Sequence, residues 1–305
     1  MSGGVPVGVL GGVPGGVLGG SWGCEPGCEI GWVEASDGRR LAYRYWRSVP
    51  AECRGVVLAA HGIQSHSGWY GYSSRRLSEA GFAVYFADRR GAGLNGRDRG
   101  HALHGLQLVH DLRTLRAEVL SRHGETVPLH LLGLSWGAKI AAASAALFPE
   151  EYASLVLLYP GLYPLLQPTR LQRFQLGLAR TFEIVRRHIP IPLDDPALFT
   201  DDVGYQDLIA EDPLALHAVS SSFLNAGRDL DEVIAGKLSH FRRRLLVMLA
   251  GGDQIINNDE TKRRLGEMRL PGLEVKEWPG ARHTLEFARE REEILGELVR
   301  WVAGG

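Results

Sequence analysis

The sequence of 305 residues has few cysteines and no long apolar run. Its three cysteines, Cys24, Cys28 and Cys53, are an odd number in a long chain, which argues against a disulfide scaffold. No second Cys or His pair at zinc spacing follows Cys24 and Cys28, so we expect free thiols there, with a metal site as the less favoured alternative. The longest apolar-looking run, residues 152–166, is interrupted by proline and glycine and is shorter than the about 20 residues of a membrane span.

An excess of charge of either sign is also absent. The 34 Lys and Arg residues nearly balance the 35 Asp and Glu residues, for a formal net charge of −1, which gives no sign of a nucleic-acid partner. Only four residues are lysines, a bias that we attribute to genome composition. Hydrophobic residues make up 45% of the chain, enough for a full core, and exclude a largely disordered protein.

The first residues differ in composition from the rest. Residues 1–28 contain the tandem repeat GGVPVGVL and GGVPGGVL, and glycine and proline both oppose regular structure. We expect a flexible extension there. A signal peptide needs a basic start and an uninterrupted apolar stretch, and this segment has neither, so we expect a cytoplasmic protein.

Short apolar strands alternate with amphipathic helices in residues 29–160 and again in 241–305. Strands are expected at 30–36, 40–46, 55–60, 82–87, 127–132, 155–159, 245–250 and 273–278, and helices at 73–81, 106–120, 138–147, 259–268 and 285–302. Residues 161–240, between these two parts, are rich in helix formers and prolines. The pattern predicts an α/β fold with a mostly parallel sheet, helices on both of its faces and a helical insertion after the sixth strand.

The segment that carries chemistry is Gly133-Leu-Ser135-Trp-Gly137, which fits G-x-S-x-G. It directly follows a predicted strand and directly precedes a predicted helix, which is the context of a nucleophile elbow. Gly133 and Gly137 remove the Cβ atoms that would clash in so sharp a turn. We therefore expect Ser135 to be the nucleophile; the alternative is an inert serine in a glycine-rich turn.

A serine hydroxyl needs a base and an acid, which follow in the order Ser, acid, His on this type of fold. Asp253 follows the strand predicted at 245–250, and His283 follows the strand at 273–278. No histidine other than His283 follows His240. Asp259 and Glu260 are the alternative acids, but we expect them to begin the next helix, where acidic residues suit the helix dipole.

Two backbone N–H groups must stabilise the oxyanion of the reaction. We expect one from Trp136, the residue after the nucleophile, and one from Ile63, in the loop after the strand at 55–60. His61 is the first residue of that loop, and we expect it to hold the loop in shape. Asp88 precedes the serine in sequence, so we expect it to form an ion pair with Arg90 and to have no catalytic role.

The chain resembles α/β-hydrolases of the monoacylglycerol lipase and lysophospholipase group, which are serine aminopeptidase S33-like hydrolases. The resemblance covers roughly residues 54–160 and 243–303, including His61 to Tyr70 and Leu77 to Gly93. It implies serine esterase chemistry, lipid-like substrates and no cofactor or metal. The chain departs from the family pattern at Ser65-His66-Ser67, where Glu-His-Ser is usual, and at Ala92, Asn95, Trp136 and Ala138.

Residues 161–240 are expected to form a cap, or lid, over the serine, with an apolar acyl pocket that excludes water. The candidate lining residues are Leu165, Leu166, Leu171, Phe174, Leu176, Phe182, Ile184, Leu214, Leu216 and Phe223. Asp201 and Asp202 are expected on a solvated face and not at a metal. The sequence leaves transient contact with a membrane or micelle open.

The favoured function is therefore hydrolysis of medium- or long-chain acyl esters through an acyl-enzyme. Two other functions remain open. An acyltransferase or thioesterase would use the same fold and serine, and a non-catalytic binding module would use the cap pocket.

Overall fold

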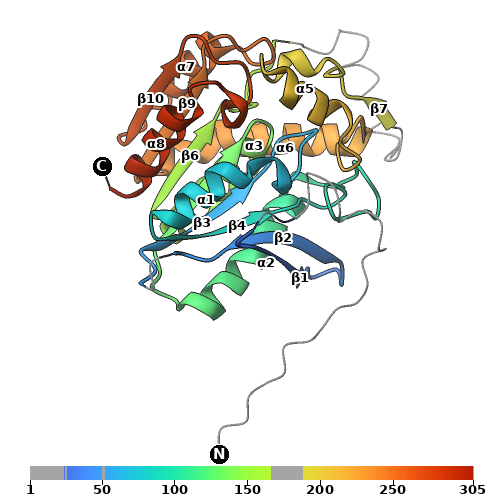
Figure 1. The fold of residues 1–305 in the computed structure, drawn as a ribbon. Helices are drawn as coiled ribbons and strands as arrows, with labels where there is room; N and C mark the ends of the chain where they lie inside the picture. The colour runs from blue at the N-terminus through green and yellow to red at the C-terminus, as the bar shows by residue number, and fades with distance from the viewer. Residues whose placement is uncertain (1–23, 25, 50–51, 166–187, 305) are drawn as a thin grey trace, which may run out of the picture.

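A central sheet organises the protein, whose computed structural model describes residues 24, 26–49, 52–165 and 188–304 (Figure 1). The strand order is β1-β2-β4-β3-β5-β6-β9-β10. The strands are β1 (Cys28–Glu34), β2 (Arg40–Trp46), β3 (Gly55–Ala60), β4 (Phe82–Ala87), β5 (Leu129–Leu134), β6 (Ser154–Leu158), β9 (Arg244–Ala250) and β10 (Leu273–Trp278). β2 is antiparallel to both β1 and β4, and every other neighbouring pair is parallel. The expected mostly parallel sheet is confirmed.

Helices cover both faces of the sheet. α1 (Gly71–Glu79) and α8 (Arg291–Val302) pack together on one face, and α2 (Gly105–His123) and α3 (Gly137–Leu147) lie on the other (Figure 1). α7 (Asn258–Glu267) joins β9 to β10. Because helices cover both faces, the central strands are continuous apolar runs: every residue of β3 is buried. As expected, Asp259 and Glu260 lie in the first turn of α7.

The insertion after β6 is less helical than expected. Its described part contains α5 (Val203–Ala210) and α6 (Ser221–Lys237), but β7 (His188–Pro190) and β8 (Ala218–Ser220) form a small antiparallel sheet. The two helices agree with the expected helical insertion, whereas the small sheet was not expected. Proline cannot continue a helix and favours extended backbone at a sheet edge, and Pro190 and Pro192 fall in this stretch. α6 packs on α3 and α2.

The expected closing helix at 285–302 is divided. A single 3-10 turn (η5, Leu285–Phe287) precedes α8, and Ala288 between them has an extended ψ of 152°. The expected helix was therefore too long at its start. Expectations for residues 1–23 and for one group of lining residues, Leu166, Leu171, Phe174, Leu176, Phe182 and Ile184, lie outside the described residues.

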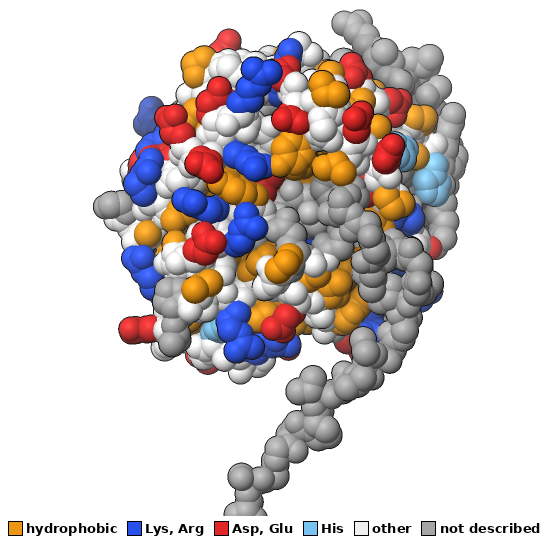
Figure 2. All heavy atoms as spheres, in the orientation of Figure 1, with side chains coloured by type: hydrophobic (Ala, Val, Ile, Leu, Met, Phe, Trp, Pro, Cys, Tyr) orange, Lys and Arg blue, Asp and Glu red, His pale blue; other side chains and the backbone are white. Residues whose placement is uncertain are grey.

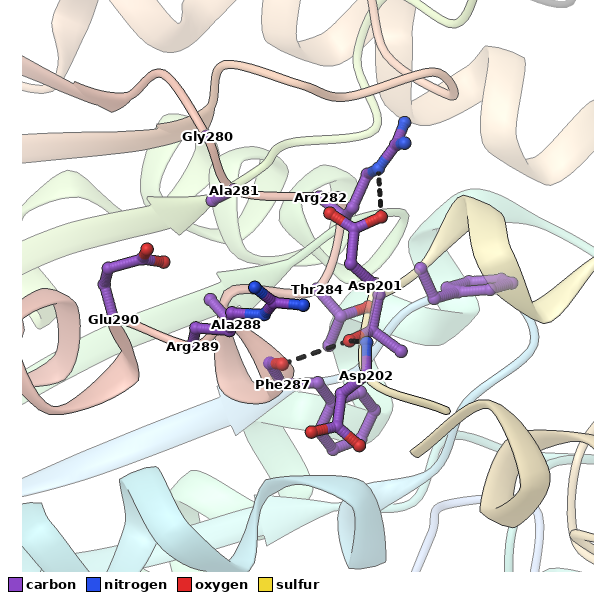
Figure 3. A pocket seen from close by; sticks show the side chains of 12 residues that line it. Asp201, Asp202, Gly280, Ala281, Arg282, Thr284, Phe287, Ala288, Arg289 and Glu290 are labelled. Carbon is purple, nitrogen blue, oxygen red and sulfur yellow. Dashed lines mark hydrogen bonds and ion pairs between the residues drawn. The ribbon is translucent and has the colours of Figure 1, made fainter. Parts of the chain in front are cut away.

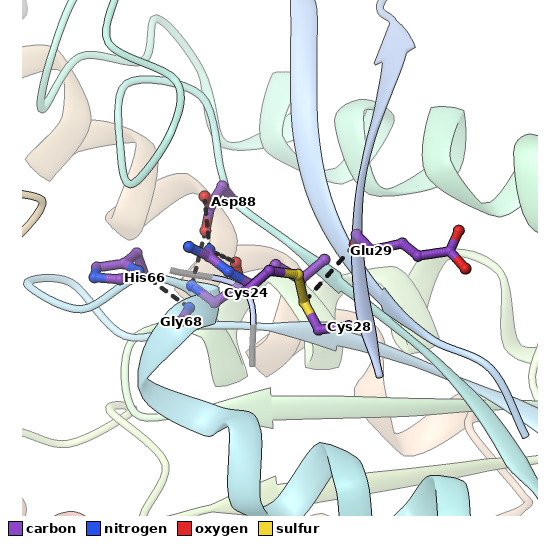
Figure 4. The surroundings of a disulfide bond; sticks show 8 residues. Cys24, Cys28, Glu29, His66, Gly68 and Asp88 are labelled. Carbon is purple, nitrogen blue, oxygen red and sulfur yellow. Dashed lines mark hydrogen bonds and ion pairs between the residues drawn. A yellow bond between two sulfur atoms is a disulfide. The ribbon is translucent and has the colours of Figure 1, made fainter. Parts of the chain in front are cut away.

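Cys24 and Cys28 form a disulfide, so the expectation of free thiols at these positions was wrong (Figure 4). The turn through Gly27, whose φ is 89°, brings their Cα atoms to 5.3 Å, a normal separation for a disulfide. Cys53 is free. In the described ranges no group of three His, Cys, Asp or Glu side chains could hold a metal ion.

The surface shown in Figure 2 carries acidic and basic side chains interspersed with apolar ones, as the near-zero net charge implies. Across the described residues, no helix has the length and apolar character needed to cross a membrane. The carboxyl ends of the parallel strands thus share one edge of the sheet, and the predicted residues Ser135, Asp253 and His283 follow β5, β9 and β10 at that edge.

Candidate active site

Ser135 lies at a sharp turn between β5 and α3. Its φ of 50° is in the left-handed region, which a non-glycine residue adopts rarely and at an energetic cost. Gly161 N–H donates to the Ser135 carbonyl at 2.8 Å and stabilises the turn. A Cβ on Gly133 would lie 2.6 Å from the Ala138 Cα, and one on Gly137 would clash with the main chain at the end of β3. The strand–turn–helix context expected from the sequence is present.

His283 lies between Ser135 and Asp253. Its Nε2 is 2.9 Å from the Ser135 Oγ, and its Nδ1 is 2.7 Å from the Asp253 Oδ2. The other carboxylate oxygen of Asp253 accepts the backbone N–H groups of Ile255 and Ile256, at 2.8 and 3.1 Å. The Asp253 side chain is fully buried and that of His283 is 2% exposed. The structure thus connects the three side chains in the order that nucleophile, base and acid require.

The two backbone amides proposed for an oxyanion hole lie beside the serine. A Cβ on Gly62, the residue before Ile63, would be 3.2 Å from the Ser135 Cβ, so the loop after β3 lies against the nucleophile. Trp136 begins the turn into α3. In the part of the chain that the structure describes, neither the Ile63 nor the Trp136 N–H donates a hydrogen bond to the protein. Both donors therefore remain for a ligand oxygen.

A family model described as "Serine aminopeptidase, S33" matches residues 51–290, which hold all of these side chains. The chain belongs to this family. It is accordingly a serine hydrolase with the α/β-hydrolase fold, as the resemblance implied. The match extends from β3 to the end of η5 and includes the insertion after β6.

Curated relatives of the family cover most of the chain. A monoacylglycerol lipase of Mycolicibacterium smegmatis is 26% identical over 276 residues, which are 87% of this chain and 93% of that protein. The human monoglyceride lipase is 23% identical over 282 residues, 88% of each chain. The solved Paleococcus ferrophilus monoacylglycerol lipase has a TM-score of 0.75 at 23% identity, covering 87% of this chain and 98% of its own. A soluble Saccharomyces cerevisiae monoglyceride lipase variant with a substrate analogue has a TM-score of 0.76 at 22% identity, covering 90% of this chain and 94% of its own.

His61 in this S33 hydrolase holds the loop after β3, as expected. It is fully buried, and burial, followed by the charge of Arg89, lowers its pKa to about 3. The ring is therefore neutral at pH 7 and has one N–H. Its Nε2 accepts the Arg89 backbone N–H at 3.1 Å, so its Nδ1 carries the proton and donates to the Gly62 carbonyl at 2.9 Å.

Asp88 is buried at the end of β4 and does not pair with Arg90. Its carboxylate lies 3.5 Å from the Arg44 guanidinium, whereas Arg90 binds Asp37 and Asp111. The expected Asp88–Arg90 ion pair was wrong, because each side chain has another partner of opposite charge: Arg44 for Asp88, and Asp37 and Asp111 for Arg90. Burial acts to raise the pKa of Asp88, but the neighbouring positive charge of Arg44 and further contacts outweigh it, and the pKa is lowered.

The insertion after β6 contacts the loop that carries His283. The Phe199 carbonyl accepts the Thr284 N–H at 2.9 Å, and the Phe199 ring lies edge-on to the His283 ring. Asp201 forms an ion pair with Arg282 at 2.8 Å. These residues line a cavity of about 370 Å³ beside the histidine loop, and Ser135 does not line it (Figure 3). We therefore do not take this cavity for the acyl pocket.

One buried cluster was not foreseen from the sequence. His66 Nε2 and Trp69 Nε1 both contact the Asp212 Oδ2, at 3.0 and 2.7 Å. Asp212 belongs to the insertion and follows α5, whereas His66 and Trp69 follow β3. No local pattern signals a contact between residues 146 positions apart; the sequence shows only an acidic residue in an otherwise ordinary loop.

Proposed function

We propose that the protein hydrolyses lipid-like carboxylic esters, of the monoacylglycerol or lysophospholipid type, through an acyl-enzyme on Ser135. The observation that carries the proposal is the position of His283, within hydrogen-bonding distance of both Ser135 and Asp253. A Ser-His-Asp arrangement on an elbow with two unused amides fits acyl transfer from an ester to water.

In the proposed mechanism, Ser135 Oγ attacks the ester carbonyl while His283 Nε2 takes its proton. Asp253 fixes the Nδ1–H tautomer of the ring and stabilises the imidazolium that forms. The Ile63 and Trp136 N–H groups stabilise the oxyanion. The imidazolium then protonates the leaving alkoxide, and in the second half His283 activates a water that hydrolyses the acyl-enzyme.

Support for a lipid-like substrate comes from the side chains next to the elbow and from the relatives. Trp136 stacks on Phe223 of α6, with ring centroids 4.4 Å apart, which gives an apolar wall between the elbow and the insertion. The relatives are named for monoacylglycerol hydrolysis. We further propose that residues 161–240 form the cap over this wall, and that Leu165, which is 48% exposed, lies where a micelle or membrane would touch it. A cytoplasmic location stays a prediction.

The proposal is tested with a fluorophosphonate probe and a series of monoacylglycerols and lysophospholipids. We expect one adduct, on the peptide that contains Ser135, and ester hydrolysis that is strongest for one acyl length. The Ser135→Ala variant should lose both, with an unchanged melting temperature, because it removes only one oxygen. Ester turnover that survives in Ser135→Ala would overturn the assignment.

A further inference from the structure

Arg89 is a buried cation that the triad does not use. It follows β4 directly, only 5% of it is exposed, and its Nε and Nη1 have no hydrogen-bond partner in the described part of the chain. The nearest carboxylate in sequence, Asp88, is already paired with Arg44. Burying a guanidinium with two unused donors costs stability. A buried cation that carries such a cost points to a functional site.

The bonds that Arg89 does make converge on the loop after β3. Its Nη2 donates to the Ile63 carbonyl and, at 3.4 Å, to the Gly62 carbonyl. Its backbone N–H donates to His61 Nε2, and the same ring donates to the Gly62 carbonyl. The Gly62 carbonyl therefore has two donors, the His61 ring within the loop and the Arg89 guanidinium from outside it.

Fixing that carbonyl also fixes an N–H. The described chain has no cis peptide bond, so the Gly62 C=O and the Ile63 N–H belong to one trans peptide and point in opposite directions. The donors that keep the Gly62 carbonyl pointing toward Arg89 therefore keep the Ile63 N–H pointing away from Arg89. Gly62 also lies against Ser135, since a Cβ on it would be 3.2 Å from the Ser135 Cβ. Rotation of this peptide would remove one oxyanion donor without moving any catalytic side chain.

The same guanidinium also contacts the second amide's residue. Its Cζ lies 5.5 Å from the centre of the Trp136 ring and 4.6 Å from that of Phe223, within cation–π distance of both. Trp136 supplies the other proposed oxyanion N–H. Arg89 thus joins the two chain segments whose amides must point at one oxygen.

We propose that Arg89 is a positioning residue of the oxyanion hole, which holds the Gly62–Ile63 peptide in its productive orientation and packs that loop against Trp136. This inference rests on the proposed ester hydrolysis. Its effect belongs to the transition state, because the oxyanion forms only there. Loss of Arg89 must therefore lower kcat and leave KM nearly unchanged.

The test compares Arg89→Met and Arg89→Lys with the wild type, using p-nitrophenyl octanoate and an alkyl fluorophosphonate. Methionine keeps much of the length and removes every side-chain donor, while the backbone N–H to His61 remains. Lysine keeps a charged side-chain donor but loses the planar guanidinium. Since loss of one oxyanion donor costs about 100- to 1,000-fold in kcat, a misdirected donor should cost about 10- to 100-fold in Arg89→Met. The rate of inactivation by the fluorophosphonate should fall in parallel, and Arg89→Lys should be intermediate.

The matched control is Arg99→Met. Arg99 also donates only to backbone carbonyls, those of Gly93, Leu214 and Ala215 at 3.2, 2.8 and 2.9 Å, and none of these belongs to the loop after β3 or to the elbow. We expect its kcat to stay within about threefold of the wild type. Melting temperatures of all variants separate misfolding from misdirection, and Arg89→Lys carries the test if Arg89→Met does not fold.

Each outcome has one meaning. A folded Arg89 variant with wild-type kcat and inactivation rate, or one that changes KM alone, overturns the positioning role. An equal loss of kcat in Arg99→Met also overturns it, because any lost arginine would then have the same effect. A folded wild type without label at Ser135 and without ester turnover overturns the proposed function itself, and the inference with it.

Discussion

At the scale of single residues, the two carboxylate oxygens of Asp253 have different partners. One carboxylate oxygen accepts two backbone amides of its own loop, and the other accepts the His283 ring. The first oxygen fixes where the second points, so the imidazole is oriented by the backbone after β9. Neutralising the carboxylate should therefore affect catalysis more than folding.

We expect Asp253→Asn to lower kcat by about 1,000- to 10,000-fold. The amide NH₂ would face His283 Nδ1 and favour the tautomer that cannot accept the Ser135 proton. The control is Asp259→Asn, since Asp259 is the alternative acid and its side chain is 95% exposed on α7. Measuring kcat of both variants with one ester substrate tests this prediction. A larger loss of kcat in Asp259→Asn than in Asp253→Asn would assign the role of the acid to Asp259.

The sequence could predict the positions of these residues because each follows a predicted strand: Ser135 and Asp253 follow apolar runs, and His283 follows the alternating stretch at 273–278. Ser135, Asp253 and His283 are found from local context and chain order alone. Arg89 could not be found in this way. Its role depends on carbonyls 26 and 27 positions earlier in the chain and on a ring of α6, and its sequence neighbours Asp88 and Arg90 suggested an ordinary charged turn.

At the scale of elements, Asp212 connects the segment after α5 to the loop after β3. His66 Nδ1 accepts the Gly68 N–H, and its Nε2 donates to Asp212. Burial acts to raise the pKa of Asp212, but the hydrogen bonds from His66 and Trp69 and further contacts outweigh it, and the pKa is lowered. The carboxylate is therefore charged at pH 7 and is the shared acceptor of two buried donors.

Asp212→Ala should lower the free energy of unfolding by at least about 2 kcal/mol, because it removes that acceptor from two buried groups. The exposed neighbour Glu211→Ala should stay within about 0.5 kcal/mol of the wild type. Urea denaturation measures both. If the two variants were equally stable, the cluster would contribute nothing to the contact between the insertion and the sheet.

Element boundaries were predictable where one signal decided them. The Asp37-Gly38 turn between β1 and β2 is such a case, with the Gly38 φ at 73°. The small β7–β8 sheet was not predictable. Its two strands have only three residues each, and β8 begins 28 positions after β7 ends. Short strands like these form only when the surrounding packing supplies both partners.

At the scale of the whole molecule, two histidines are held neutral inside the fold. Burial lowers the pKa of His61 to about 3, and burial, followed by the charge of Arg244, lowers that of His130 to about 4. An unfolded histidine has a pKa of about 6.5. Between pH 6.5 and 4 the unfolded state therefore binds more protons than the folded state. The stability that these histidines contribute is present above pH 6.5 and is lost as the pH falls.

His130 allows this loss to be measured away from the candidate active site, because it lies on β5 with its Nδ1 2.8 Å from the Ser154 Oγ. Each such histidine should remove about 1 kcal/mol of the free energy of unfolding between pH 6 and pH 5. His130→Gln cannot take up this proton. It should be less stable than the wild type at pH 7, because packing and a hydrogen bond change, yet lose about 1 kcal/mol less from pH 6 to pH 5. Urea denaturation at pH 6 and pH 5 separates the two effects of the substitution. The packing change lowers the free energy of unfolding equally at both pH values, and only the lost proton uptake changes the difference between them. An unchanged difference would mean that His130 is protonated in the folded protein.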